Sequence, residues 1–135
     1  MAAAEPSGRT ASVGRLLRLA TVTCLAAAIA ACAAGPPAPT LAVPSGALIV
    51  RAVDTTFQPA QLTAPAGGGF VLYFDNADAL LHNVVVRSAD GTAVLQGDVF
   101  SGPAQRVYDM PAMASGTYTL HCDVHPEMNG TLTVP

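Results

Sequence analysis

The chain has 135 residues, the length of one small domain with a short targeting segment. Charged residues account for 11% of the sequence and apolar residues for 51%, which excludes a disordered tail. Three cysteines are too few for a disulfide scaffold. After Val50 there are three arginines and eight acidic residues, a net charge of −5. An acidic domain without basic clusters argues against nucleic acid as a partner.

The first segment, residues 1–31, has the pattern of a secretory signal peptide. Arg9, Arg15 and Arg18 precede an uncharged run from Leu19 to Ala31. A basic start followed by an apolar stretch of this length is typical of export signals, whereas a permanent membrane span needs about 20 apolar residues. We therefore expect residues 1–31 to be removed on export.

The end of this run, Ile29-Ala30-Ala31-Cys32, resembles the lipobox of bacterial lipoproteins. The resemblance implies a lipid on Cys32 that holds the protein at the cell membrane, and a diacylglyceryl cysteine supplies enough acyl chains for stable anchoring. The alternative is an ordinary cleavage site beside a chance cysteine. Residues 32–46 are rich in alanine and proline and predict a linker between the anchor and the domain.

The remaining residues, 47–135, predict one all-β domain. Short β-branched and aromatic runs alternate with Gly, Pro, Asn and Asp, and no window shows a helical period. Seven or eight short strands at this spacing predict a two-sheet sandwich. The expected strands are Leu48–Val53, Gln61–Ala64, Phe70–Asp75, Asn83–Arg87, Val94–Leu95, Gln105–Asp109, Thr117–Cys122 and Gly130–Val134.

Strand alternation places two metal-ligating residue types on inward faces. In the segment before Cys122, the apolar residues Tyr118 and Leu120 share its face, so the thiol is expected inside. The same parity turns His82 inward. His121 points the other way and is expected to be exposed.

A metal-binding pattern follows the inward-facing cysteine. Cys122, His125 and Met128 are spaced three residues apart, and His82 lies far upstream. Two imidazoles and a thiolate with a distant thioether form the donor set of a blue copper site. The soft sulfur donors favour Cu(I), and imidazole accepts both oxidation states.

The stretch from Leu48 to Val134 resembles the cupredoxin (type 1 blue copper) family, and especially its short-loop members of the amicyanin and pseudoazurin kind. The resemblance is carried by the pair His82-Asn83, the run Gly116–Met128, and Gly130 with the closing strand. It implies a Greek-key β-sandwich that binds one copper ion.

By this resemblance, His82, Cys122 and His125 are the equatorial ligands and Met128 is the axial ligand. Asn83 follows the first histidine, where the family uses asparagine to tie the two ligand loops together. Each residue also has a purely structural interpretation: His82 as a core histidine, Cys122 as an inert thiol, Met128 as core packing and Asn83 as a turn residue.

Other metal centres lack their donors. Structural zinc requires four Cys or His ligands, a binuclear copper centre requires a second cysteine in the loop, and haem attachment requires Cys-x-x-Cys-His. A copper ion whose positions are all filled by protein leaves no place for a substrate. The sequence therefore predicts a one-electron carrier rather than an enzyme, without a small-molecule substrate. The alternatives are a lipoprotein that stores or delivers copper and a copper-free interaction domain.

Electrons are expected to pass through the exposed edge of His125 to a redox protein that docks on an apolar patch around it. The candidates for this patch are Leu80, Leu81, Pro126 and Met113. The run Met110–Met113 has three interpretations: loop packing, an apolar lip near the metal, or a weak contact with Cu(I). We expect the protein to be exported and lipid-anchored at the membrane, at the cell surface or in the periplasm.

One departure from the family generates a prediction. Many members have proline before the loop histidine, whereas this chain has Val124. Valine keeps a backbone N–H that could reach the sulfur of Cys122, draw charge from the thiolate and favour Cu(I). Val124→Pro is therefore expected to lower the reduction potential measured by voltammetry, and an unchanged or raised potential would count against this hydrogen bond.

Overall fold

The computed structural model describes residues 40–135, so the predicted signal peptide, Cys32 and most of the predicted linker lie outside the described residues. The described part folds into eleven strands, and none of it forms a helix able to span a membrane. The strands are β1 (Leu48–Val53), β2 (Thr56–Gln58), β3 (Gln61–Thr63), β4 (Phe70–Asn76), β5 (Leu81–His82), β6 (Val85–Arg87), β7 (Ala93–Gln96), β8 (Phe100–Ser101), β9 (Ala104–Met110), β10 (Gly116–Cys122) and β11 (His125–Val134).

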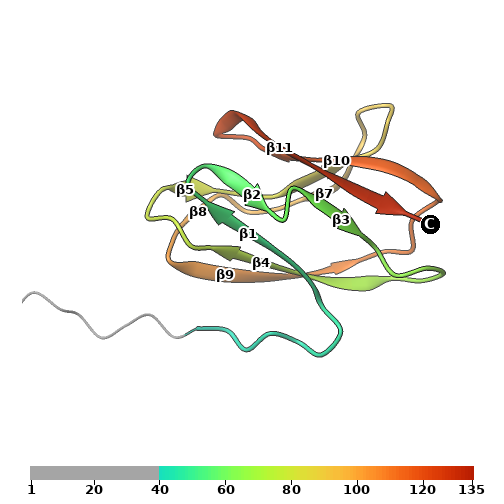
Figure 1. The fold of residues 1–135 in the computed structure, drawn as a ribbon, viewed down its shortest axis with the longest axis horizontal. Coiled ribbons are helices and arrows are strands. Elements are labelled where there is room, and N and C mark those ends of the chain that lie inside the picture. Colours follow the sequence, from blue (N-terminus) through green and yellow to red (C-terminus); the bar gives the residue numbers. More distant parts are fainter. Residues whose placement is uncertain (1–39) are drawn as a thin grey trace, which may run out of the picture. The chain divides into compact units, whose positions relative to one another are not determined.

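The strands form two main sheets and one short ribbon (Figure 1). The first sheet has the order β2-β1-β4-β9, and the second has the order β3-β11-β10-β6-β7. The ribbon pairs β5 with β8. The pairs β1–β4 and β3–β11 are parallel, and the others are antiparallel. The expected all-β sandwich is confirmed.

The structure has more strands than the seven or eight expected. The short strands β2, β5 and β8 fall outside the expected ranges, and β11 begins at His125 instead of Gly130. Asn129 and Gly130 lie within β11 and pair with His121 and Leu120, although Asn and Gly are common turn residues. Glycine is needed there because a Cβ at residue 130 would lie 2.9 Å from the carbonyl oxygen of Ala60. It marks a close backbone approach rather than a turn.

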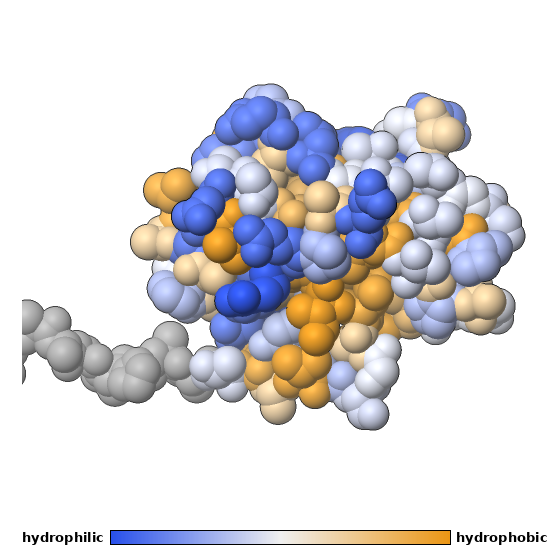
Figure 2. All heavy atoms as spheres, in the orientation of Figure 1, coloured by the Kyte–Doolittle hydropathy of each residue, from blue (hydrophilic) through white to orange (hydrophobic). Residues whose placement is uncertain are grey.

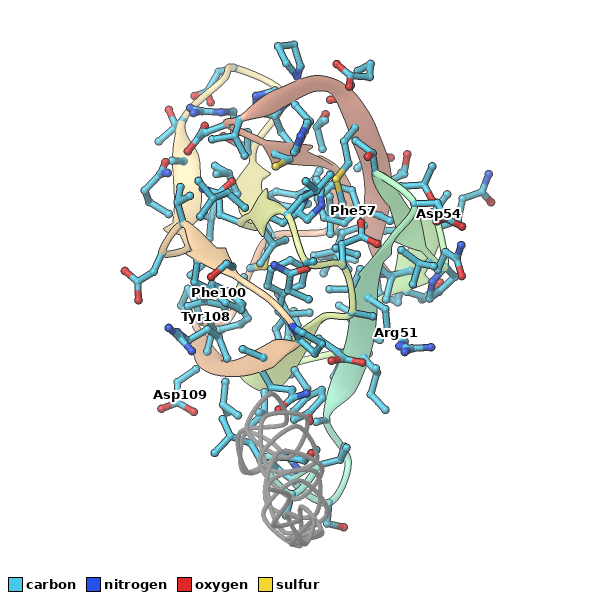
Figure 3. The ribbon with its side chains drawn as sticks, turned by 90° about the vertical axis from the view of Figure 1, so that its left-hand side faces the viewer. Arg51, Asp54, Phe57, Phe100, Tyr108 and Asp109 are labelled. Atoms are coloured by element: carbon cyan, nitrogen blue, oxygen red, sulfur yellow. The ribbon has the colours of Figure 1, made fainter. Side chains whose placement is uncertain are left out.

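The core lies between the two main sheets. Phe74 of β4 is completely buried, and the ring of Phe100 meets it edge to face with centroids 5.7 Å apart. The ring of Phe57 is tilted against that of Phe74, with centroids 6.4 Å apart. Figure 3 shows Arg51 and Asp109 directed outward from the same sheet. The strands β1 and β9 therefore have one face toward the core and one toward solvent, as strand alternation requires.

The chain enters the domain across the first sheet. The carbonyl of Leu41 accepts a hydrogen bond from the hydroxyl of Tyr73 at 2.8 Å, and its N–H donates to Gln105 at 3.2 Å. Leu41, Val43, Ile49 and Val107 are among the large apolar side chains that stay exposed. Figure 2 shows apolar residues gathered in the lower part of this view, next to the point where the described chain begins.

The run Met110–Met113 packs against the core. Met110 is 4% exposed and pairs with Phe70 at the start of β4, and Met113 is partly buried against the core. The other end of β4, at Asn76, lies beside Leu80 through a side-chain hydrogen bond of 2.9 Å. Met113 therefore lies near the opposite end of the sandwich from Leu80, and its assignment to the patch around His125 is wrong.

The core makes a direct prediction. Phe74→Ala should lower the free energy of unfolding by about 3–5 kcal/mol, because it opens a cavity among the three aromatic rings. Val107→Ala is the control, since Val107 is 41% exposed, and should change stability by less than about 0.5 kcal/mol. Urea unfolding of the apoprotein measures both, and a loss below about 1 kcal/mol for Phe74→Ala would contradict the packing described here.

Candidate metal centre

The hairpin between β10 and β11 carries three of the predicted ligands. Cys122 ends β10 and pairs with His125, the first residue of β11, across a two-residue turn. The next pair is His121 with Asn129, so the register shifts between residues 121 and 122. The three residues between His125 and Asn129 have no partners on β10 and form an irregular bulge of three residues. Bulges of this kind redirect side chains next to functional sites.

The bulge turns Met128 inward. Met128 is 1% exposed and belongs to the same buried cluster as Cys122, whereas Pro126 and Glu127 are exposed. The cysteine itself is fully buried and makes no disulfide. A thioether and a thiol therefore both enter the interior from one short hairpin.

The second strand segment brings His82. It ends β5 and is completely buried, and its Nδ1 lies 3.8 Å from the sulfur of Cys122. Nδ1 of His125 lies 3.7 Å from the same sulfur. The two imidazole rings have centroids 4.5 Å apart. One nitrogen from each histidine and the sulfur all lie within 4.8 Å of one another, as a shared metal ion requires.

These separations fit a trigonal centre. A first-row ion such as zinc binds thiolate at about 2.3 Å and imidazole at about 2.0 Å, which puts sulfur and nitrogen about 3.7 Å apart for an angle of about 120°. The distances from the sulfur of Cys122 to the two histidines are 3.7 and 3.8 Å. Two imidazoles and one thiolate suit copper better than a hard cation.

Asn83 links the two ligand segments. Its side-chain oxygen accepts the backbone N–H of Asp123 at 2.9 Å, and its side-chain nitrogen donates to the carboxylate of Asp123 at 2.8 Å. The same nitrogen also donates to the carbonyl of Gly97 at 3.0 Å. Gln96 donates to the same carboxylate at 2.6 Å. These bonds join the residue after His82 to the residue after Cys122, and the donation from Asn83 holds the pKa of the Asp123 carboxyl below its ordinary value.

The electrostatic surroundings keep His82 neutral. Burial lowers the pKa of His82, and the nearby His125 lowers it further, while the hydrogen-bonding carboxylate of Asp78 opposes the shift. Neutral imidazole is the form that binds a metal ion, because protonation would occupy the nitrogen lone pair. Asp78 itself has a lowered pKa, mainly through the backbone N–H of Thr55.

The third histidine, His121, is expected from strand alternation to lie outside the metal centre. His121 is partly exposed on the opposite face from Cys122, and its Nδ1 lies 3.1 Å from the side-chain oxygen of Asn129. It does not join the donor cluster. Sequence reasoning missed the contacts of Asp78 and Asp123, because isolated carboxylates between strands carry no spacing signal of their own.

Comparisons with known proteins agree with this geometry. The profile of the cupredoxin-like domain family matches residues 21–134. Amicyanin of Paracoccus denitrificans is 29% identical over 93 residues, 68% of this chain and 68% of that protein. The amicyanin structure from Paracoccus versutus has a TM-score of 0.55 at 25% identity, covering 69% of this chain and 85% of that chain.

A more distant likeness supports the fold alone. Reduced auracyanin from Roseiflexus castenholzii has a TM-score of 0.58 at 19% identity, and the match covers 67% of this chain and 98% of that chain. The family match spans most of the chain and includes the whole strand region. The chain therefore belongs to the cupredoxin-like family, which binds one copper ion, and this membership indicates a blue copper, electron-transfer protein.

Proposed function

We propose that the protein carries single electrons between redox partners at the outer face of the cytoplasmic membrane or in the periplasm. The observation that carries the proposal is the position of the Cys122 sulfur, which is fully buried and 3.7–3.8 Å from one nitrogen of each of two histidines. When bound, copper supplies one-electron chemistry by alternating between Cu(I) and Cu(II). His82, Cys122, His125 and Met128 would hold the ion.

The surroundings of the donors suit a carrier better than an enzyme. His82, Cys122 and Met128 are buried, so these donors are closed to water and to substrates. The hydrogen bonds of Asn83 to Asp123 involve none of the metal-ligating atoms and hold both ligand segments together, so little rearrangement is needed on a change of charge. The matched proteins include amicyanin in a reduced Cu(I) form, at 27% identity.

The partner surface is proposed to surround His125, the one histidine donor that is only partly buried. Leu80 and Leu81 are 54% and 52% exposed beside His82, and Val124 is 41% exposed next to His125 in sequence. Together with Pro126 these residues form an apolar docking patch. A small patch of this kind suits weak, transient complexes, and the acidic domain favours partners with basic or neutral docking surfaces.

Location follows the same proposal. The basic start and apolar run before Ala31 direct export, and Cys32 carries the lipid that attaches the domain to the membrane through its alanine- and proline-rich linker. The anchored protein would then meet its partners at the membrane surface.

Copper storage or delivery is the alternative use of the same ligands. The partial exposure of His125 is the observation that favours delivery, because an acceptor protein can approach the ion from that side. Fast electron self-exchange with firmly retained copper supports the carrier, whereas rapid release of Cu(I) to a chelator supports delivery.

The first test is visible spectroscopy of the exported domain with Cu(II). The purified protein should bind one equivalent and show a strong thiolate-to-copper charge-transfer band, because Cys122 supplies a thiolate donor. Cys122→Ser should abolish the band. His121→Ala is the matched control, since His121 lies outside the donor cluster, and should keep it. Absence of the band from the wild-type protein would refute the proposal.

A second prediction concerns Asn83. Asn83→Ala should lower the free energy of unfolding of the apoprotein by about 2–4 kcal/mol, because the buried carbonyl of Gly97 and two groups of Asp123 lose their hydrogen bonds to Asn83. Modification of the Cys122 thiol by a thiol reagent should also become faster. Gln58→Ala, at an exposed position, is the control. An unchanged rate of thiol modification in Asn83→Ala would show that Asn83 does not hold the ligand loops together.

A further inference from the structure

Asp78 joins two separate parts of the molecule through one carboxylate. Its Oδ1 accepts the backbone N–H of Asp54 at 3.0 Å. Its Oδ2 accepts the backbone N–H of Thr55 at 3.1 Å and lies 3.0 Å from Nε2 of His82. The Asp78 side chain is 16% exposed, and the imidazole is fully buried. The turn between β1 and β2 is therefore linked to the candidate metal centre.

The contact with Asp78 determines which nitrogen of His82 carries the proton. A carboxylate can only accept, so Nε2 must donate its hydrogen to Oδ2. A neutral imidazole has one N–H, and Nδ1 is then left with a free lone pair. Nδ1 is the nitrogen that lies 3.8 Å from the sulfur of Cys122. The bond to Asp78 thus selects the tautomer that a metal ion at this site requires.

The turn that supports Asp78 is unusual for its sequence. Asp54 and Thr55 have φ angles of 50° and 58°, in the left-handed region that suits glycine and is rare for a β-branched residue. Two-residue hairpin turns of this geometry favour Asn-Gly. Successive backbone N–H groups in such a turn form a small anion-binding concavity, which the carboxylate of Asp78 fills.

Asp78 is also held in place by a hydrogen bond from its own backbone. Its backbone N–H donates to the side-chain oxygen of Asn76 at 3.1 Å, and Asn76 is completely buried. The amide nitrogen of Asn76 donates to the carbonyls of Leu80 and Phe100 at 2.9 and 3.0 Å. The connection from β4 to β5 and the strand β8 are thereby joined, and the carboxylate has little freedom to move away from His82.

We propose that Asp78 is a positioning residue of the copper centre, which uses the β1–β2 turn as its support and holds His82 with Nδ1 directed toward Cys122. This inference rests on the proposed function only in that copper is the ion bound. The alternative is that Asp78 only stabilises the β1–β2 turn. The two roles predict different results when the turn is given a sequence that does not need Asp78.

The experiment combines three variants of the exported domain. Asp78→Asn removes the charged acceptor. The double variant Asp54→Asn/Thr55→Gly gives the turn a sequence that adopts its geometry without help. The triple variant combines them. Asp90→Asn is the matched control, because Asp90 also accepts hydrogen bonds in a turn, from Ser88 and Thr92, but belongs to the β6–β7 connection.

Three measurements are made on each variant, and the first is the resistance of the apoprotein to unfolding by urea, which Asp78→Asn should lower. Nitrogen-15 NMR of the apoprotein at neutral pH reports which nitrogen of His82 carries the proton. Transfer of Cu(I) to a chelator reports the copper dissociation rate. The wild-type protein, the double variant and Asp90→Asn should show the proton on Nε2 and similar dissociation rates. Asp78→Asn should lose the single tautomer and release Cu(I) at least about tenfold faster.

The triple variant separates the two roles. It should regain the resistance to urea that Asp78→Asn loses, yet keep the altered tautomer and the faster copper release. Recovery of all three properties in the triple variant would overturn the proposal in favour of a structural role. A proton on Nδ1 in the wild-type apoprotein would also overturn it, even if Asp78→Asn fails to fold. Because the NMR measurement needs no metal, failure of the wild-type protein to bind copper would refute the proposed function, while the NMR result would still decide whether Asp78 sets the tautomer of His82.

Discussion

The metal centre depends on two chain segments, 40 residues apart, being held at one place by hydrogen bonds that use none of the donor atoms. Asn83 bonds to both the backbone and the side chain of Asp123, so the residues after His82 and Cys122 are joined as a pair. The sulfur of Cys122 and Nδ1 of His82 then lie 3.8 Å apart. The ligand segments are therefore ordered during folding. Such order suits a metal centre whose ion changes oxidation state while its ligands stay in place.

The same principle extends outward from the donors. The buried asparagines Asn76 and Asn83 both donate to backbone carbonyls of other segments. Buried amides without partners would destabilise the fold, so each segment that they contact is held in one place. Asp78 contacts His82 and Asp123 contacts Asn83, and each of these carboxylates accepts hydrogen bonds from more than one donor. Rigidity around the copper ligands thus comes from polar groups, while the aromatic rings around Phe74 supply the apolar core.

The four candidate donors differ in their exposure to solvent, and only one end of the molecule offers a route to the candidate metal centre. His82, Cys122 and Met128 are buried, whereas His125 is partly exposed and is followed by the exposed Pro126. Leu80 and Leu81 add exposed apolar surface from the ribbon that carries His82. Under the proposed function, a redox partner at this end would approach the ion through the exposed edge of the His125 imidazole. The Met110–Met113 run, which packs at the other end of β4, takes no part in it.

The sequence by itself determined the strand class, the inward face of Cys122 and the spacing of Cys122, His125 and Met128, because alternation and short spacings are local properties. It could not show that β11 begins at His125, since the bulge that turns Met128 inward exists only when β10 pairs with it. The contacts of Asp78 with the β1–β2 turn and of Asp123 with Asn83 were equally hidden. Tertiary structure decided these features, because a carboxylate takes its role from donors that arrive from distant parts of the chain.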